Sequence, residues 1–161
     1  MILVDTNILS TFAKIDRLDL LEKVLGEMHI SPNVLDEVKR AEELGYSHAE
    51  KILKGIKEGK ILISCIREDE VEFLEKVPSS FGRGERDCVA IALNRDALIV
   101  TNERRVLNYC KRNGIAHVRL NTILRKLWKD EIIEEKEVRD LIHKIEENDS
   151  LIIVDKESIF S

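Results

Sequence analysis

A short apolar run, residues 2–4, stands at the start of the chain and ends directly on Asp5. An uninterrupted run of this kind is typical of a strand buried on both faces, as the inner strands of a parallel sheet are. Open α/β sheets bind their ligands beyond the carboxyl ends of such strands. We therefore expect Asp5 at a ligand-binding edge, although an Asp in this position can also serve only as the cap of the following helix.

Further apolar runs alternate along the chain with stretches in which apolar residues recur at helical spacing. Strands are expected at residues 2–4, 28–30, 61–66, 97–101, 117–120 and 151–154, and helices near residues 8–15, 18–25, 48–58, 69–76, 85–94, 103–112, 121–128 and 135–147. Another helix is expected to begin at Ser31-Pro32, a cap followed by proline in the first helical position, and to end at Gly45. Strands that alternate with helices predict an α/β fold, a parallel sheet with helices on both faces.

Composition narrows the class of protein. The chain has 161 residues, which fits one domain, and its formal net charge of −5 argues against a surface coated in basic charge for non-specific DNA binding. A local basic rim is compatible with this charge, so nucleic acid is not excluded. Cys65, Cys88 and Cys110 are odd in number and form no CxxC pair, which indicates a reduced, cytoplasmic chain. No secretory signal is recognisable and no apolar run approaches the ~20 residues that span a bilayer, so no membrane association is expected.

Acidic residues recur at three further places where they can join Asp5. Glu37 flanks the apolar stripe of the helix that precedes Gly45. Glu85 and Asp87 stand in the first turn of the next long helix, and Glu103 follows the strand at 97–101. The carboxyl ends of parallel strands open on the same side of a sheet, so Glu103 and Asp5 are expected at one edge.

Each of these acids also has an ordinary structural explanation. Glu37 can be a solvated helix charge, Glu85 and Asp87 complement a helix dipole by ~0.3–1 kcal/mol each, and Glu103 can be the first charge of a capped helix. That so many acids occur in comparable positions favours a common site. Carboxylates that are held together without cations repel one another. Oxygen ligands without His or Cys suit Mg²⁺ or Mn²⁺, and Mg²⁺ shares its coordination with substrate phosphates, which points to phosphoryl-transfer or phosphodiester chemistry.

At these residues the chain resembles the PIN-domain family, which includes the toxins of VapBC toxin–antitoxin pairs. The matching segments are residues 4–7, 31–38, 84–93 and 98–103, and their order and spacing fit over residues 1 to about 128. The resemblance implies a three-layer α/β/α, Rossmann-like parallel sheet and a metal-dependent endoribonuclease site that uses Mg²⁺ or Mn²⁺. We expect a single PIN-like domain over residues 1–161, with a core of about 1–128 and a helical and strand extension of about 129–161.

The resemblance also assigns roles by position. Asp5, Glu37 and Asp87 match the first three acidic residues of the family, and Glu103 matches the fourth, which is more often Asp. These four are expected to bind metal and to be catalytic. Glu85 resembles the Glu of a Gly-Glu variant of the third motif and is expected to share the catalytic role of Asp87.

Neighbouring polar residues complete the expected site. Ligands or waters are expected to be oriented by Thr6, Asn7, Thr101 and Asn102, the last of which stands where some family members carry a further Asp. A basic rim for RNA is expected at Arg83 and Arg86, beside Asp87. Other candidates for this rim, most of them better explained as ordinary surface charges, are Lys14, Arg17, Lys39, Arg40, Arg104 and Arg105.

Two other functions fit the same residues. A PIN-like module with a weakened metal site would hold RNA or a protein without cutting, and Asn102 with Glu103 leaves room for this alternative. A phosphoacceptor or phosphatase with Asp5 as nucleophile would need a second Asp two residues on or a Lys at a later strand end, where the chain has Asn7 and Thr101-Asn102. The partners that the resemblance implies are RNA, an antitoxin protein if the chain is a toxin, and a second copy in a homodimer.

Overall fold

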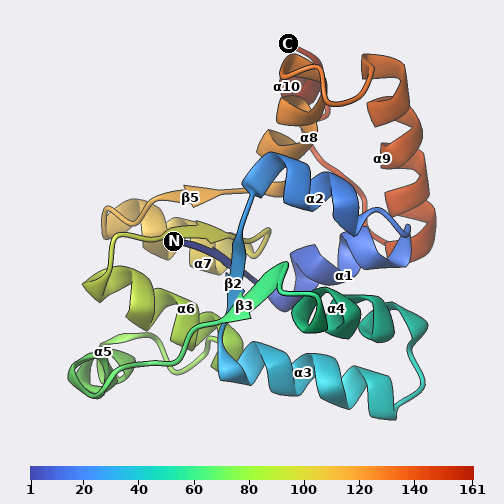
Figure 1. The fold of residues 1–161 in the computed structure, drawn as a ribbon. Coiled ribbons are helices and arrows are strands. Elements are labelled where there is room, and N and C mark those ends of the chain that lie inside the picture. The colour runs from blue at the N-terminus through green and yellow to red at the C-terminus, as the bar shows by residue number, and fades with distance from the viewer.

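The computed structural model describes residues 1–161 and has at its centre one parallel sheet (Figure 1). Its five strands lie in the order β3-β2-β1-β4-β5. Their bounds are β1 Ile2–Val4, β2 Met28–Ile30, β3 Ile61–Ile63, β4 Leu98–Val100 and β5 His117–Val118. The chain moves outward from β1 to β3 and then returns to place β4 on the other side of β1. This reversal lies between β1 and β4, at the point where open α/β sheets bind ligands.

Helices connect the strands and cover both faces of the sheet. They are α1 Thr6–Lys14, α2 Leu18–Leu25, α3 Pro32–Glu43, α4 Ser47–Lys57, the 3₁₀ turn η1 Glu68–Glu70, α5 Val71–Lys76, α6 Arg83–Asn94, α7 Arg104–Arg112, α8 Leu120–Lys129, α9 Glu135–Asp149 and α10 Glu157–Phe160. The expected three-layer α/β/α architecture is confirmed.

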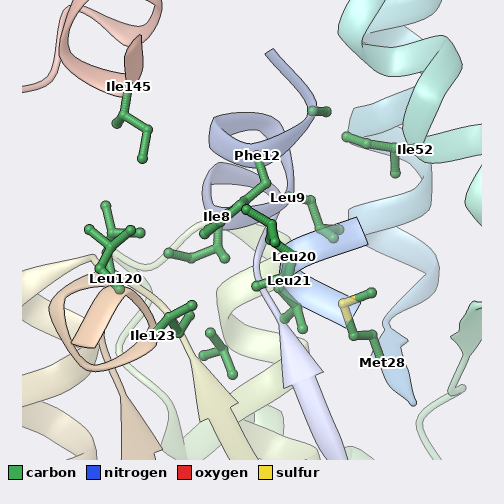
Figure 2. Close-up of a cluster of buried hydrophobic side chains, with 14 of the residues drawn as sticks. Ile8, Leu9, Phe12, Leu20, Leu21, Met28, Ile52, Leu120, Ile123 and Ile145 are labelled. Carbon is green, nitrogen blue, oxygen red and sulfur yellow. The ribbon is translucent and has the colours of Figure 1, made fainter. Parts of the chain in front are cut away.

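The strands divide the core in two because successive side chains point to opposite faces. Val4 and Val100 belong to the larger cluster, which includes side chains of α1–α4, α8 and α9. Leu3 and Ile99 belong to the smaller cluster, formed with α6 and α7. Figure 2 shows part of the larger cluster, in which Phe12 of α1 lies among side chains from several helices. β1 and β4 are therefore buried on both faces, as their uninterrupted apolar runs predicted, whereas Leu62 and Ile63 of the edge strand β3 are exposed.

Local signals place the ends of several helices where the sequence indicates. The Ser31 hydroxyl caps α3 by accepting a hydrogen bond from the Val34 N–H at 3.2 Å. Gly45, just past α3, has φ +88, a left-handed conformation that is costly for a residue with a Cβ. These two signals fix α3 directly after β2, so that its first turn lies at the carboxyl edge of the sheet.

The C-terminal extension packs on the rest of the chain rather than forming a core of its own. Val138, Leu141 and Ile145 of α9 are buried in the same cluster as α1 and α8. The Trp128 indole donates a hydrogen bond to the Ile159 carbonyl at 2.8 Å, which ties α10 to α8. In Figure 1 the C-terminal end of α9 reaches α1. None of the helices is both long and apolar enough to cross a membrane.

The expected edge strand at residues 151–154 is wrong, because this segment forms no strand and pairs with no neighbour. Ile153 is buried against the helices, whereas Ile152 and Val154 are exposed. The expected strands at 61–66 and 117–120 are shorter in the structure, and Leu120 already belongs to α8. An apolar run shows that a segment is partly buried, but it does not show what the segment packs against.

Candidate functional site

Asp5 lies where β1 ends and α1 begins. Its N–H donates to the Val100 carbonyl at 3.1 Å, so the residue is anchored to the end of β4. One carboxylate oxygen accepts from the Ile8 N–H at 2.8 Å, which makes Asp5 the cap of α1. The side chain is nonetheless only 6% exposed. Capping accounts for one of its oxygens, and the second oxygen faces the end of β4.

Thr101 holds this second oxygen. Its hydroxyl donates to Asp5 Oδ2 at 2.5 Å and accepts from the Glu103 N–H at 3.1 Å. Thr101 is buried, and it directly follows Val100, the β4 partner of Val4. The register between β1 and β4 therefore sets Thr101 beside Asp5.

Glu37 reaches the same edge from α3. Its carboxylate accepts a hydrogen bond from the hydroxyl of Thr6, the first residue of α1. A Cβ built on Gly84 of α6 would lie 2.7 Å from Val34 Cγ2 and 3.3 Å from Glu37 Oε1. The contact between α3 and α6 therefore requires glycine at position 84, and it holds Glu37 against the start of α6.

The two acids of α6 have different surroundings. Glu85 is half-buried, and its Oε2 accepts from the Gly82 N–H at 3.0 Å. Asp87 is 4% exposed, and its Oδ2 accepts from the Asn33 amide at 2.7 Å. Glu85 lines the same hollow as Asp5, whereas Asp87 does not line it and is held by Asn33 of α3.

This hollow has a volume of about 60 Å³ and is lined by Asp5, Thr6, Asn7, Val34, Glu37, Gly82, Gly84 and Glu85. It brings together residues from three separate segments of the sequence. Three of the lining residues are acids: Asp5, Glu37 and Glu85. Glu103 lies at its border rather than in its wall: its Oε1 is 3.3 Å from the Asn7 amide, which donates to it. Asn102 is exposed and lines a neighbouring cavity instead.

The pKa of Asp5 reflects its burial and the charge of two nearby acids. Burial raises the pKa of Asp5 to about 6; the hydrogen bonds from Thr101 and Ile8 oppose this, while the charges of Glu85 and Glu103 add to it. Uncompensated negative charge inside a protein is expensive unless it is paired or bound to metal. The hollow therefore presents a strong attraction for a cation.

The pKa of the buried Cys88 thiol on α6 is affected by the same carboxylates. Burial raises its pKa, and the carboxylates of Asp5, Asp87, Glu37 and Glu85 act in the same direction. Four of the expected site acids thus lie within electrostatic reach of one sulfur atom. The thiol itself is a protonated, buried side chain, as the sequence indicated.

The residues of the hollow suit a hard divalent cation. The side-chain atoms that they offer as metal ligands are all oxygens, which Mg²⁺ and Mn²⁺ prefer. As the side chains stand, no three His, Cys, Asp or Glu residues are arranged to bind one ion together. Hydrogen bonds instead occupy one oxygen each of Glu37, Glu85 and Asp87. Binding an ion would require Glu37 and Glu85 to turn from these partners toward Asp5.

The expected basic rim is only partly in place. Arg83 is exposed at the start of α6, next to the hollow. Arg86 is half-buried and donates to the Leu74 carbonyl of α5 at 2.7 Å, so its guanidinium supports the packing of α5 instead of facing an open rim. Lys14 and Arg17 pair with Asp149 and Asp19. Four other expected members are exposed: Lys39, Arg40, Arg104 and Arg105.

Two residues of the site were not singled out by sequence reasoning. Gly84 is required by the approach of two helices, and a glycine inside a helical pattern is the signal that indicates such a contact. Asn33 holds Asp87, but nothing in the sequence distinguishes it from any polar residue in the first turn of a helix. Both lie in segments that matched the family pattern.

A family model described as a PIN domain (DUF3368) matches residues 1–156. The match continues through α8 and α9, beyond the residues that the sequence motifs covered. A search of curated proteins gave no match.

Proposed function

Because the chain belongs to the PIN-domain family, whose members are in general nucleases, we propose that it is a metal-dependent endoribonuclease that hydrolyses RNA phosphodiester bonds. The observation that carries the proposal is the buried carboxylate of Asp5 at the point where the sheet reverses its strand order, with further carboxylates around it. A structural cap has no need of this surrounding negative charge. A cation site does.

The acids would share the binding of Mg²⁺ or Mn²⁺. Asp5 is held from two sides by Ile8 and Thr101 and is the fixed ligand. Glu37 and Glu85 line the same hollow and are the ligands that move. The bound ion would supply a Lewis acid for the phosphodiester and lower the pKa of a water. The adjacent carboxylates of Asp87 and Glu103 would contribute charge and orient waters from behind and beside the hollow.

The direct test replaces Asp5 by Asn and measures cleavage of a structured RNA with Mn²⁺ present. Asn keeps the shape and the helix cap but removes the charge. Because mutations of residues that only support metal ligands cost about 10- to 100-fold, loss of the fixed ligand should reduce cleavage by at least about 100-fold. Asp36→Asn is the matched control, since Asp36 is the exposed neighbour of Glu37 on α3. Equal cleavage by wild type and Asp5→Asn would reject the proposal.

Metal titration separates the proposal from its alternative, a module that binds RNA without cutting. Calorimetry with Mn²⁺ should show binding to the wild type and to Asp36→Asn, and no binding to Asp5→Asn. A wild-type chain that binds RNA but neither Mn²⁺ nor Mg²⁺, and leaves the RNA intact, would favour the non-catalytic module.

The partners expected from the family stay predictions. A homodimer is tested by light scattering coupled to size-exclusion chromatography of the purified chain. The toxin role and its antitoxin partner are tested by inducing the chain in a bacterial host, where growth arrest that Asp5→Asn relieves would support them.

A further inference from the structure

A second cavity opens directly beside the acidic hollow. Its volume is about 350 Å³, within the range of ~300–1,000 Å³ that is typical of small-ligand sites. The polar side chains that line it include Asn7, Ser10, Lys14, Asn102, Asp149 and Ser150. They come from α1, from the loop after β4 and from the C-terminal end of α9. The cavity exists only because the C-terminal extension packs against α1.

We propose that this cavity binds the nucleoside next to the scissile phosphate and so selects the base beside which RNA is cut. The inference rests on the proposed ribonuclease function and adds a substrate subsite to it. It also gives the extension a role: α9 would form one wall of the subsite.

Continuity with the acidic hollow is the first argument. Asn7 lines both spaces, and its amide donates to Glu103, which lines the larger one. A group seated in the larger cavity therefore lies next to the expected metal ligands. The smaller space, about 60 Å³, has room for little more than ions and waters. The rest of a nucleotide needs another place, and the larger cavity is contiguous.

The lining matches the two chemical sides of a nucleoside. Ile8, Leu120 and Leu151 line the cavity; the first two are buried, so the half-buried Leu151 is the aliphatic side chain that can contact a base face. The hydroxyls of Ser10 and Ser150 can meet the ribose or the edge of the base. Sequence-selective RNA recognition commonly combines these contacts on bases that are splayed out of a helix.

Asp149 supplies a fixed hydrogen-bond acceptor in the wall. The Lys14 ammonium lies 2.5 Å from its Oδ1, and the Thr11 hydroxyl donates to its Oδ2 at 2.6 Å. Burial alone would raise the pKa of Asp149, but these two partners outweigh it and lower the pKa. The carboxylate is therefore ionised at neutral pH. It is held in one place with lone pairs left for the N–H groups of a base.

The charges favour a nucleoside over a free anion. Glu103 and Asp149 place two negative charges at the cavity, and Lys14 places one positive charge. A phosphate ion entering this space would be repelled, whereas a neutral base and ribose would not. The phosphate of a bound RNA is expected instead over the acidic hollow, where a metal ion neutralises the carboxylates.

A binding experiment tests the subsite without any catalysis. The four ribonucleosides are titrated separately into ¹⁵N-labelled wild-type chain, and backbone amide shifts are followed by NMR. At least one nucleoside should shift the amides of Ser10, Thr11, Asn102 and Ser150, and inorganic phosphate should not. Absence of shifts with all four nucleosides, or equal shifts with phosphate, would overturn the proposal.

Variants of Ser10 connect the shifts to this cavity. Ser10→Phe fills the space from α1 and should weaken nucleoside binding at least about tenfold, whereas Ser10→Ala leaves the space open and should change it less than about threefold. Ser150→His fills the cavity from the opposite wall, and His tolerates the left-handed backbone found at φ 48. A correctly folded Ser10→Phe or Ser150→His chain that binds nucleosides as tightly as the wild type would overturn the proposal.

Cleavage provides the second readout. On an RNA with all four bases at each position, the wild type should cut beside a preferred base, and Ser10→Phe should lose that preference. Binding of Mn²⁺, measured by calorimetry, does not involve a nucleoside and should be the same in both. An unchanged base preference in Ser10→Phe would refute the subsite. If the wild type does not cut the RNA, the proposed function fails, and the NMR titration still decides whether the cavity binds a nucleoside.

Discussion

Asp5→Asn should make the metal-free chain more stable at neutral pH while it removes activity. The folded chain raises the pKa of Asp5 from 3.8 to about 6, chiefly by burial. The folded chain therefore binds this proton more tightly than the unfolded chain does. The resulting contribution to the free energy of unfolding is complete below pH 3.8 and is lost as the pH rises through about 6. Above pH 6 the folded chain therefore carries the full cost of an ionised Asp5.

The size of the effect follows from the two pKa values. The difference between about 6 and 3.8 corresponds to about 3 kcal/mol at roughly 1.4 kcal/mol for each tenfold change in proton affinity. Asn keeps the helix cap. It weakens the hydrogen bond from Thr101, which costs about 1 kcal/mol. The net gain at pH 8 is about 2 kcal/mol. For a chain of this length that is a rise in Tm of about 4–8 °C.

Thermal unfolding followed by circular dichroism, with EDTA at pH 8 and pH 4, measures the effect. The gain should be present at pH 8 and absent at pH 4, where Asp5 is protonated in the folded wild type. Asp36→Asn, at an exposed position on α3, should change Tm by less than about 2 °C at both pH values. A variant at position 5 that is no more stable than the wild type at pH 8 would refute the assignment of Asp5 as a buried, destabilised carboxylate.

Three further predictions concern metal and packing. Mn²⁺ at 100 times its Kd should stabilise the wild type against urea by about 2.7 kcal/mol and should leave Asp5→Asn unchanged. Gly84→Ala should destabilise the chain by about 1–3 kcal/mol in urea unfolding, because the added Cβ collides with α3. Gly82→Ala is the control and should be tolerated, since a Cβ at position 82 would lie 3.8 Å from its nearest atom. Glu70→Ala should cost about 3–5 kcal/mol by the same measurement, since Glu70 is fully buried and the Arg95 guanidinium, now 2.8 Å away, would keep only the Cys65 carbonyl and lose its carboxylate partner.

Much of the fold was predictable because its signals are local. Apolar runs located all five strands of the sheet, and the Ser31-Pro32 and Gly45 pair marked α3. The strand expected at 151–154 was wrong because strand formation depends on a partner: this segment pairs with no strand, and Ile153 is buried in the larger cluster instead. Such pairing is decided by the whole fold and leaves no mark on a four-residue run.

For the site, the sequence predicted where residues lie along the chain better than where their side chains point. The sequence placed Asp5 and Thr101 correctly at strand ends, because strand ends are positions along the chain. It placed Arg86 on a rim from its neighbourhood to Asp87, yet the structure directs the guanidinium to Leu74. Which way a long side chain turns depends on α5, which lies elsewhere in the sequence. Asn33 was overlooked for the same reason.

Asp5 combines two roles in one side chain: it caps α1, and in the proposed function it also holds the metal ion. Under the proposed function, a single change of Asp5 to Asn or Ser would therefore remove the chemistry and leave the architecture intact, since both residues cap a helix as well as Asp does. Descendants that had lost the chemistry would survive as folded scaffolds, and position 5 alone would distinguish them from working copies.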